Sequence, residues 1–210
     1  MTISLQKGET IALKKNDNKL KKIKVCLGWD AKKKDNSLIS FLTNDFWGFS
    51  SESKEYDLDA SAFLLSNNRI KETIYYAHLC NFSKTVVHSG DNLTGEGKDL
   101  DKEQITVNLQ KLPSDINGIY FAVNIFRAEE RNQDFSKIKN AFIRIVNMDN
   151  EEEFCKYELS GKNYDGNEAM LFGILKKENN EWNFEACGDE IKYGSTISDV
   201  KRQILNKLNN

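Results

Sequence analysis

Residues 104–109 read "QITVNL" and alternate between polar and apolar side chains. In an extended chain, Ile105, Val107 and Leu109 lie on one face, and the polar residues between them lie on the other. That alternation is typical of an antiparallel strand with one buried face and one face in water. The stretch therefore predicts a β-strand that covers a hydrophobic core.

Ten further strand-like runs occur along the chain at intervals of about ten residues, which is the pattern of an all-β protein. Two of them, "YFAVNIF" and "AMLFGIL", are apolar enough to be central strands buried on both faces. Little of the remaining sequence has helical periodicity, so we predict an all-β fold, a β-sandwich of two packed, mostly antiparallel sheets. The ten runs span residues 11–15, 22–29, 56–65, 72–79, 85–90, 118–126, 141–147, 154–160, 168–175 and 182–187.

Two segments have helical character instead. In residues 195–208, apolar side chains recur every three or four positions. Thr196 and Asp199 have the spacing of a capping box at the start of this segment. We therefore predict a C-terminal amphipathic helix that docks on the sandwich. A shorter helical turn is predicted in "NQDFSKIKN", capped by Asn132 or Asp134.

Residues 31–55 form a polar segment with a small aromatic cluster. We predict an inserted loop or hairpin there, whose aromatic side chains either bind a partner or pack on the core. No linker-like composition divides the chain. Residues 1–210 are therefore predicted to form a single sandwich domain.

Composition excludes several classes of function. The chain has a net charge of -2 and 39% hydrophobic residues, so it is a folded protein without the basic field that nucleic acid requires. No stretch resembles a signal peptide or a membrane span, which predicts a cytoplasmic protein with no integral membrane association. Peripheral association with a membrane stays open. The four cysteines have no metal-ligand spacing and are expected to be buried, reduced thiols.

Carboxylates gather beside two of the predicted strands. Asp57 and Asp59 are two positions apart, so they point the same way at the start of a strand whose later residues are apolar. Asp99, Asp101 and Glu103 repeat this spacing directly before "QITVNL". Like charges on one face are unfavourable alone, and burial makes them harder to leave unpaired.

The segment between these groups is rich in glycine. It reads "GDNLTGEG" over residues 90–97 and adds Asp91, Asn92 and Glu96. Oxygen donors without histidine or cysteine suit Ca²⁺, which takes six to eight oxygen ligands, whereas Mg²⁺ keeps more of its water. A solvated acidic loop is the ordinary alternative for a charge block. Spacing and composition leave both interpretations open.

Four blocks, in order along the chain, resemble the TerD family of tellurite-resistance and general stress proteins. They are "LGWD" at 27–30, "DLDASAFLL" at 57–65, "HSGDNLTGEG" at 88–97 and "NIFRAEERNQDFSKIKNAFIRIVN" at 124–147. The resemblance covers most of the chain. It implies a β-sandwich that binds Ca²⁺ through acidic loops and has no established catalytic reaction.

The same resemblance implies the metal ligands. The family's D-L-D pair and its glycine turn are present, but Lys98 and Lys102 interrupt the acidic tail that follows, and Arg127 stands where the family often has aspartate. The predicted ligands are Asp57, Asp59, Asp91, Asn92, Leu93, Gly95, Glu96, Asp99, Asp101 and Glu103.

These observations favour a calcium-binding, non-enzymatic module of a stress or tellurite-resistance system, with other proteins of that system as partners. A metal-dependent hydrolase that uses the same carboxylates is one alternative, although no base is evident. His78 and His88 are interpreted as strand side chains. A binder of cyclic nucleotides or small anions, through Arg127, Arg131 and Arg144, is the other alternative.

Overall fold

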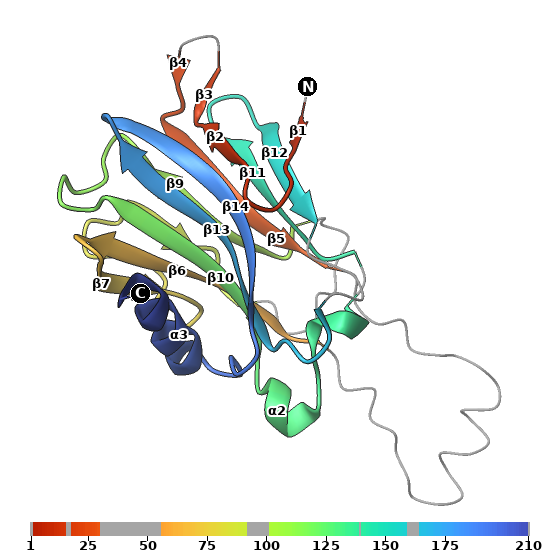
Figure 1. The fold of residues 1–210 in the computed structure, drawn as a ribbon. Coiled ribbons are helices and arrows are strands. Elements are labelled where there is room, and N and C mark those ends of the chain that lie inside the picture. The colour runs from red at the N-terminus through yellow and green to blue at the C-terminus, as the bar shows by residue number, and fades with distance from the viewer. Residues whose placement is uncertain are drawn as a thin grey trace, which may run out of the picture.

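The computed structural model describes residues 2–15, 18–29, 56–91, 101–138, 140–158 and 164–209. Within them, most residues in regular structure belong to strands, and two large sheets pack face to face (Figure 1). The predicted all-β sandwich is therefore confirmed. The predicted insertion at 31–55 lies outside the described residues.

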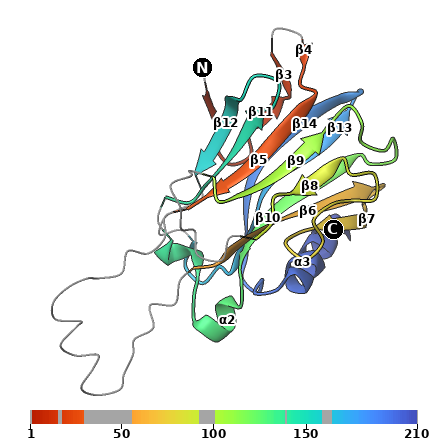
Figure 2. The same cartoon turned by 180° about the vertical axis from the view of Figure 1, so that it is seen from behind.

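The first sheet has six strands in the order β1-β12-β11-β5-β9-β8. It faces the viewer in Figure 2. Every pairing in this sheet is antiparallel except that of β1 with β12, which is parallel. The strands are β1 Ile3–Ser4, β12 Glu152–Glu158, β11 Phe142–Asn147, β5 Lys22–Gly28, β9 Glu103–Asn108 and β8 Val86–His88.

The second sheet also has six strands, in the order β2-β14-β13-β10-β6-β7, and all its pairings are antiparallel. A separate hairpin joins β3 (Lys14–Lys15) to β4 (Asn18–Lys19). The strands of the second sheet are β2 Thr10–Ala12, β14 Glu181–Ile191, β13 Ala169–Glu178, β10 Gly118–Ile125, β6 Leu58–Ser66 and β7 Arg69–Ile74.

The main core lies between the two sheets. Ile105 and Val107 of β9 are fully buried in it, as their alternation predicted. Phe121 and Phe172, from the central strands β10 and β13, stack with ring centroids 5.9 Å apart. Burial of each such side chain stabilises the fold by about 1.5–3 kcal/mol.

Helix α3 (Ile197–Asn209) covers the outer face of the second sheet (Figure 1). Its residues Val200 and Ile204 are buried against that face, where β6 contributes Phe63. The Asp199 N–H donates to Thr196 Oγ1 at 3.3 Å, and Thr196 Oγ1 donates to the Asp199 carboxylate at 2.6 Å. The predicted amphipathic helix and its cap are confirmed.

Three details differ from the sequence predictions. The strand predicted at 72–79 ends at Ile74, because the chain then turns to cross from one sheet to the other. The run at 11–15 is divided between β2 and β3. A one-turn helix α2 (Ala128–Arg131), too short for periodicity to reveal, follows β10. The helical turn η1 (Phe135–Lys137) is capped by Asp134, one of the two predicted caps.

Candidate metal centre

Asp57 and Asp59 lie where β6 begins, on the outer face of the second sheet. Leu58 and Ala60 point into the main core, so the intervening acidic residues must point away from it. Both residues are nevertheless only 4% exposed. The start of β6 therefore buries two acidic side chains that face the same way.

A third carboxylate comes from the other sheet. Asp91 follows β8 and is exposed, and it brings one oxygen within 4.8 Å of an oxygen of each of the two buried aspartates. We call Asp57, Asp59 and Asp91 the carboxylate cluster. The structure thus brings together acidic residues that are distant in sequence and belong to the two different sheets.

Two oxygen atoms at the cluster have no hydrogen-bond partner among the described residues. They are Oδ1 of Asp57 and Oδ1 of Asn124, both buried. Asn124 lies opposite Asp59 in the β10–β6 register, and its Nδ2 donates to Asp59 Oδ2 at 3.4 Å. An unsatisfied buried polar group costs about 1–3 kcal/mol. An all-oxygen set with orphaned acceptors fits a hard cation such as Ca²⁺.

Electrostatics at the cluster disfavour two charged aspartates side by side. Burial, followed by the charges of Glu103, Asp57 and Asp91, raises the pKa of Asp59 from 3.8 to about 8. Burial and the Asp91 charge raise the pKa of Asp57 to about 6, although Arg131 acts in the opposite direction. A bound cation would reverse both effects, because metal ligands must be deprotonated.

Glu103, a predicted ligand, lies beside the cluster. Its Oε2 accepts a hydrogen bond of 2.6 Å from the backbone N–H of Ala60, the residue after Asp59. The same oxygen is 3.4 Å from Nε2 of His88, and both side chains are fully buried. Glu103 therefore supports the strand that carries Asp59 and adds negative charge to the site.

The structure places Asp101, another predicted ligand, against Arg144. The guanidinium donates through Nε at 2.8 Å and through Nη2 at 2.9 Å to the two carboxylate oxygens of Asp101. A third bond of 2.9 Å joins Arg144 Nη1 to Glu153. Asp101 therefore pairs with an arginine and is not part of the carboxylate cluster. The remaining predicted ligands, Asn92, Leu93, Gly95, Glu96 and Asp99, lie outside the described residues.

Arginines and aromatic rings flank the cluster. Phe126 donates its backbone N–H to the carbonyl oxygen of Asp57 at 2.9 Å. The guanidinium carbons of Arg127 and Arg131 lie 5.2 and 5.7 Å from the centroid of its ring, which is cation–π distance. The ring of Tyr76 meets that of Phe126 edge to face at 6.1 Å. The cluster thus has positive charge at its rim.

The four cysteines are free thiols. Three of them are buried, as predicted, whereas Cys80 is half-buried. Burial is the main cause that raises the pKa of Cys155 and of Cys187 to about 12. Thiols held protonated in this way are poor nucleophiles.

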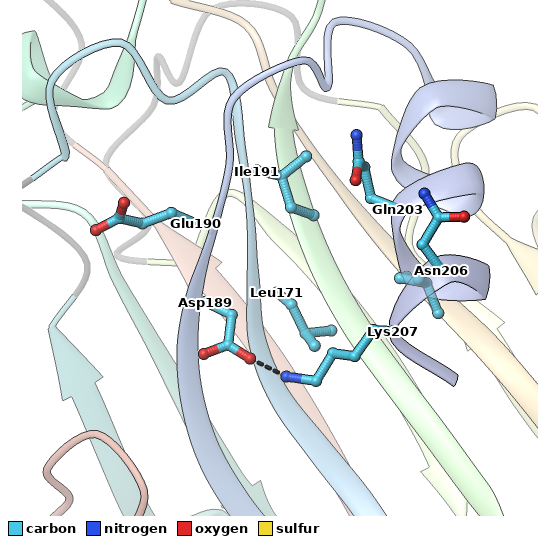
Figure 3. Close-up of a pocket in the computed structure, with 8 residues that line it drawn as sticks. Leu171, Asp189, Glu190, Ile191, Gln203, Asn206 and Lys207 are labelled. Atoms are coloured by element: carbon cyan, nitrogen blue, oxygen red, sulfur yellow. Dashed lines mark hydrogen bonds and ion pairs between the residues drawn. The ribbon is translucent and has the colours of Figure 1, made fainter. Parts of the chain in front are cut away.

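A separate hollow of about 340 Å³ lies on the same outer face, between β14 and α3. Figure 3 shows Asp189 of β14 and Lys207 of α3 pointing toward each other across it, and the two form an ion pair. Leu171 contributes to the floor, and Gln203 and Asn206 to the helix side. The ion pair ties the end of α3 to the sheet, and the hollow is a part of the face that the helix leaves uncovered.

Sequence reasoning missed Asn124 as a member of the site. The signal was a lone polar residue within "YFAVNIF", a run otherwise apolar enough for a strand buried on both faces. Burial of an amide there requires a partner, and its cross-strand neighbour Asp59 supplies one.

Fold and site together define a β-sandwich protein with a carboxylate cluster of two buried aspartates and one exposed aspartate. The family model described as "TerD domain" matches residues 1–199. The chain belongs to the TerD family, which confirms the resemblance seen in the sequence. Among the described residues, no helix is long and apolar enough to cross a membrane.

Curated relatives and solved structures agree with this assignment. The chain is 39% identical to "Tellurium resistance protein TerD" of Serratia marcescens over 192 residues, which is 90% of each chain. It is 38% identical to "General stress protein 16U" of Bacillus subtilis, with 92% of this chain and 93% of the relative covered. A crystal structure of a homologue of telluride resistance protein (TerD) from Streptomyces coelicolor superposes with a TM-score of 0.64 at 16% identity. It covers 86% of this chain and 98% of the other.

Proposed function

We propose that the chain is a calcium-binding, non-enzymatic module of a cellular stress or tellurium-resistance system. The observation that carries the proposal is the convergence of three carboxylates within 4.8 Å, beside a buried Asp57 oxygen that has no hydrogen-bond partner among the described residues. The system is inferred from relatives that are named for tellurium resistance and general stress.

Asp57, Asp59 and Asp91 would hold the ion, and the carbonyl oxygen of the Asn124 side chain is a further donor at the site. When bound, Ca²⁺ supplies the positive charge that the buried aspartates lack. The residues themselves then do two things: they join a strand of one sheet to a loop of the other, and they change the charge of this end of the molecule. We propose that this altered end binds another protein of the same system.

Calcium titration calorimetry tests the proposal. Wild type should bind Ca²⁺, and Asp57→Asn with Asp59→Asn should abolish binding without change of side-chain size. Asp115→Asn is the matched control, because that carboxylate is exposed and pairs with Lys71 at the other end of β10. Absence of heat from wild type at millimolar Ca²⁺, or equal binding by the double variant, would refute the calcium site.

A hydrolase is disfavoured by what surrounds the cluster. In metal-assisted hydrolysis the ion lowers the pKa of its bound water, and a neighbouring base such as histidine helps to remove the proton. His88 is the nearby imidazole, but its Nε2 is 3.1 Å from the Ala60 carbonyl oxygen and its Nδ1 accepts from the Gly90 N–H. Both ring nitrogens are therefore engaged with backbone groups.

Binding of a small anion is a second candidate function, which the arginines around Phe126 favour. Without a cation, the carboxylates repel an anion from this rim, so a phosphate or cyclic nucleotide should bind only when Ca²⁺ is present. Thermal unfolding with the nucleotide, with and without Ca²⁺, tests this. A calcium-dependent rise in Tm that is lost in Arg127→Ala would support it. The control is Arg202→Ala, on the exposed side of α3, which should keep the rise. No shift in wild type would exclude it.

A further inference from the structure

His88 occupies an unusual place between the two sheets. It ends β8, an edge strand of the first sheet, and its side chain points inward. The residue is 2% exposed, whereas its neighbour Val87 is 36% exposed on the opposite face. The imidazole is therefore enclosed at the side of the sandwich where β8 approaches the second sheet.

The hydrogen bonds of the ring fix its tautomer. Nδ1 accepts from the backbone N–H of Gly90 at 3.0 Å, so this nitrogen carries no proton. The proton is on Nε2, which donates to the carbonyl oxygen of Ala60 at 3.1 Å. Gly90 has a φ of 106°, a conformation that favours glycine, and the turn there directs its N–H back to the ring.

His88 and Glu103 together replace a missing strand. Strand β7 pairs with β6 as far as Ile74 opposite Ala62 and then departs, so β6 has no strand neighbour at Ala60 on that side. The Ala60 N–H donates to Glu103, and the Ala60 carbonyl accepts from His88. Two side chains of the first sheet thus satisfy the backbone of the second, which a buried edge requires.

The position of these bonds along the chain links them to the carboxylate cluster. Ala60 directly follows Asp59, and Gly90 directly precedes Asp91. The His88 imidazole therefore links two backbone positions. One lies beside the buried Asp59 of the second sheet, and the other lies beside the exposed Asp91, which follows the first sheet. Neither nitrogen is left to coordinate an ion.

We propose that His88 is a positioning residue that sets Asp91 against Asp59 and thereby determines the strength of calcium binding. The inference rests on the proposed calcium site. Loss of a group that orients a metal ligand typically weakens metal binding by about 10–100-fold. His88→Phe keeps a buried ring but removes both hydrogen bonds, so it should weaken Ca²⁺ binding by at least about tenfold.

Graded variants separate positioning from packing. His88→Asn can still accept from Gly90 and His88→Gln can still donate to Ala60, so each should bind Ca²⁺ with an affinity between those of His88→Phe and wild type. His78→Phe is the control, because this histidine is exposed in the turn after β7. A packing role alone predicts no such rescue, and if His88→Phe does not fold, these two variants still test the inference.

The decisive experiment combines His88→Phe with Asp91→Asn and measures Ca²⁺ affinity by calorimetry. If His88 acts by placing Asp91, the Asp91 substitution weakens binding clearly in wild type and by less than about twofold in the His88 variant, because coupled residues are not additive. Equal losses in both backgrounds, or wild-type affinity in His88→Phe, would overturn the inference. Absence of Ca²⁺ binding by wild type would instead refute the proposed function.

Discussion

Asp59 should make the metal-free protein less stable as pH rises. Its pKa lies at about 8 in the folded protein, above the ordinary 3.8, so folding favours the protonated form. The stability that this proton contributes is complete at low pH and is lost as pH rises through the folded value. With these two values, the free energy of unfolding falls by about 3 kcal/mol between roughly pH 5.5 and pH 8.

Urea unfolding with a chelator measures this change. Asp59→Asn cannot titrate at this position, so the difference in unfolding free energy between wild type and variant reports the Asp59 carboxyl group together with its effect on the carboxylates coupled to it. That difference should change by about 3 kcal/mol over this range, with the variant gaining relative to wild type as pH rises. A change below about 1 kcal/mol would refute the reasoning about burial and repulsion.

Calcium should reverse the pH dependence. Because the ion requires charged carboxylates, its binding near pH 7 should release about one proton, mostly from Asp59. Calorimetry in two buffers of different ionisation enthalpy counts the protons. Release of none near pH 7 would mean that Asp59 is already charged in the metal-free protein.

Three further substitutions test the packing around the site and in the sheets by urea unfolding. Arg144→Met should destabilise the fold by about 2 kcal/mol, because it leaves the half-buried Asp101 carboxylate without its guanidinium. Adding Asp101→Asn should recover part of the loss. No recovery would contradict the pairing. Gly173→Ala should lower the free energy of unfolding by about 2–3 kcal/mol, since its Cβ would lie 2.4 Å from an aromatic ring of β14. Gly118→Ala should be nearly neutral, because its Cβ would lie 3.6 Å from its nearest neighbour. Equal effects would argue against the clash. Thr196→Ala should lower the free energy of unfolding by about 1 kcal/mol through loss of the α3 cap. Thr196→Ser keeps the capping hydroxyl and should retain that stability. A similar loss in both variants would contradict the role of the cap.

Local pattern predicted many of the strands, because alternation reveals a strand with one buried face and a continuous apolar run reveals a strand buried on both faces. Alternation in residues 104–109 predicted β9, and helical spacing with a cap predicted α3. The end of β7 was not predictable in this way, since Tyr75 and Tyr76 have the β propensity of strand residues. They leave the strand because the chain must cross between sheets, which is a tertiary requirement.

The candidate site was predictable only in part for a similar reason. The spacing of Asp57 and Asp59 showed that they share a face, and resemblance suggested Asp91 as their partner. Spacing gave Asp101 the same role, yet Arg144 holds it on the first sheet. Which acidic residue meets a cation and which meets an arginine depends on strand pairing across the sandwich, and no local pattern contains that information.

The N-terminal segment has a consequence for biosynthesis. β1 pairs with β12 and β2 pairs with β14, so strands within residues 3–12 find their neighbours more than 140 residues later in the sequence. Contacts so distant in sequence slow folding, because a long loop must close before they form. During synthesis, β1 and β2 therefore stay without their strand partners until β12 and β14 have been made. Closure of this side of the sandwich is expected to be a late step in folding.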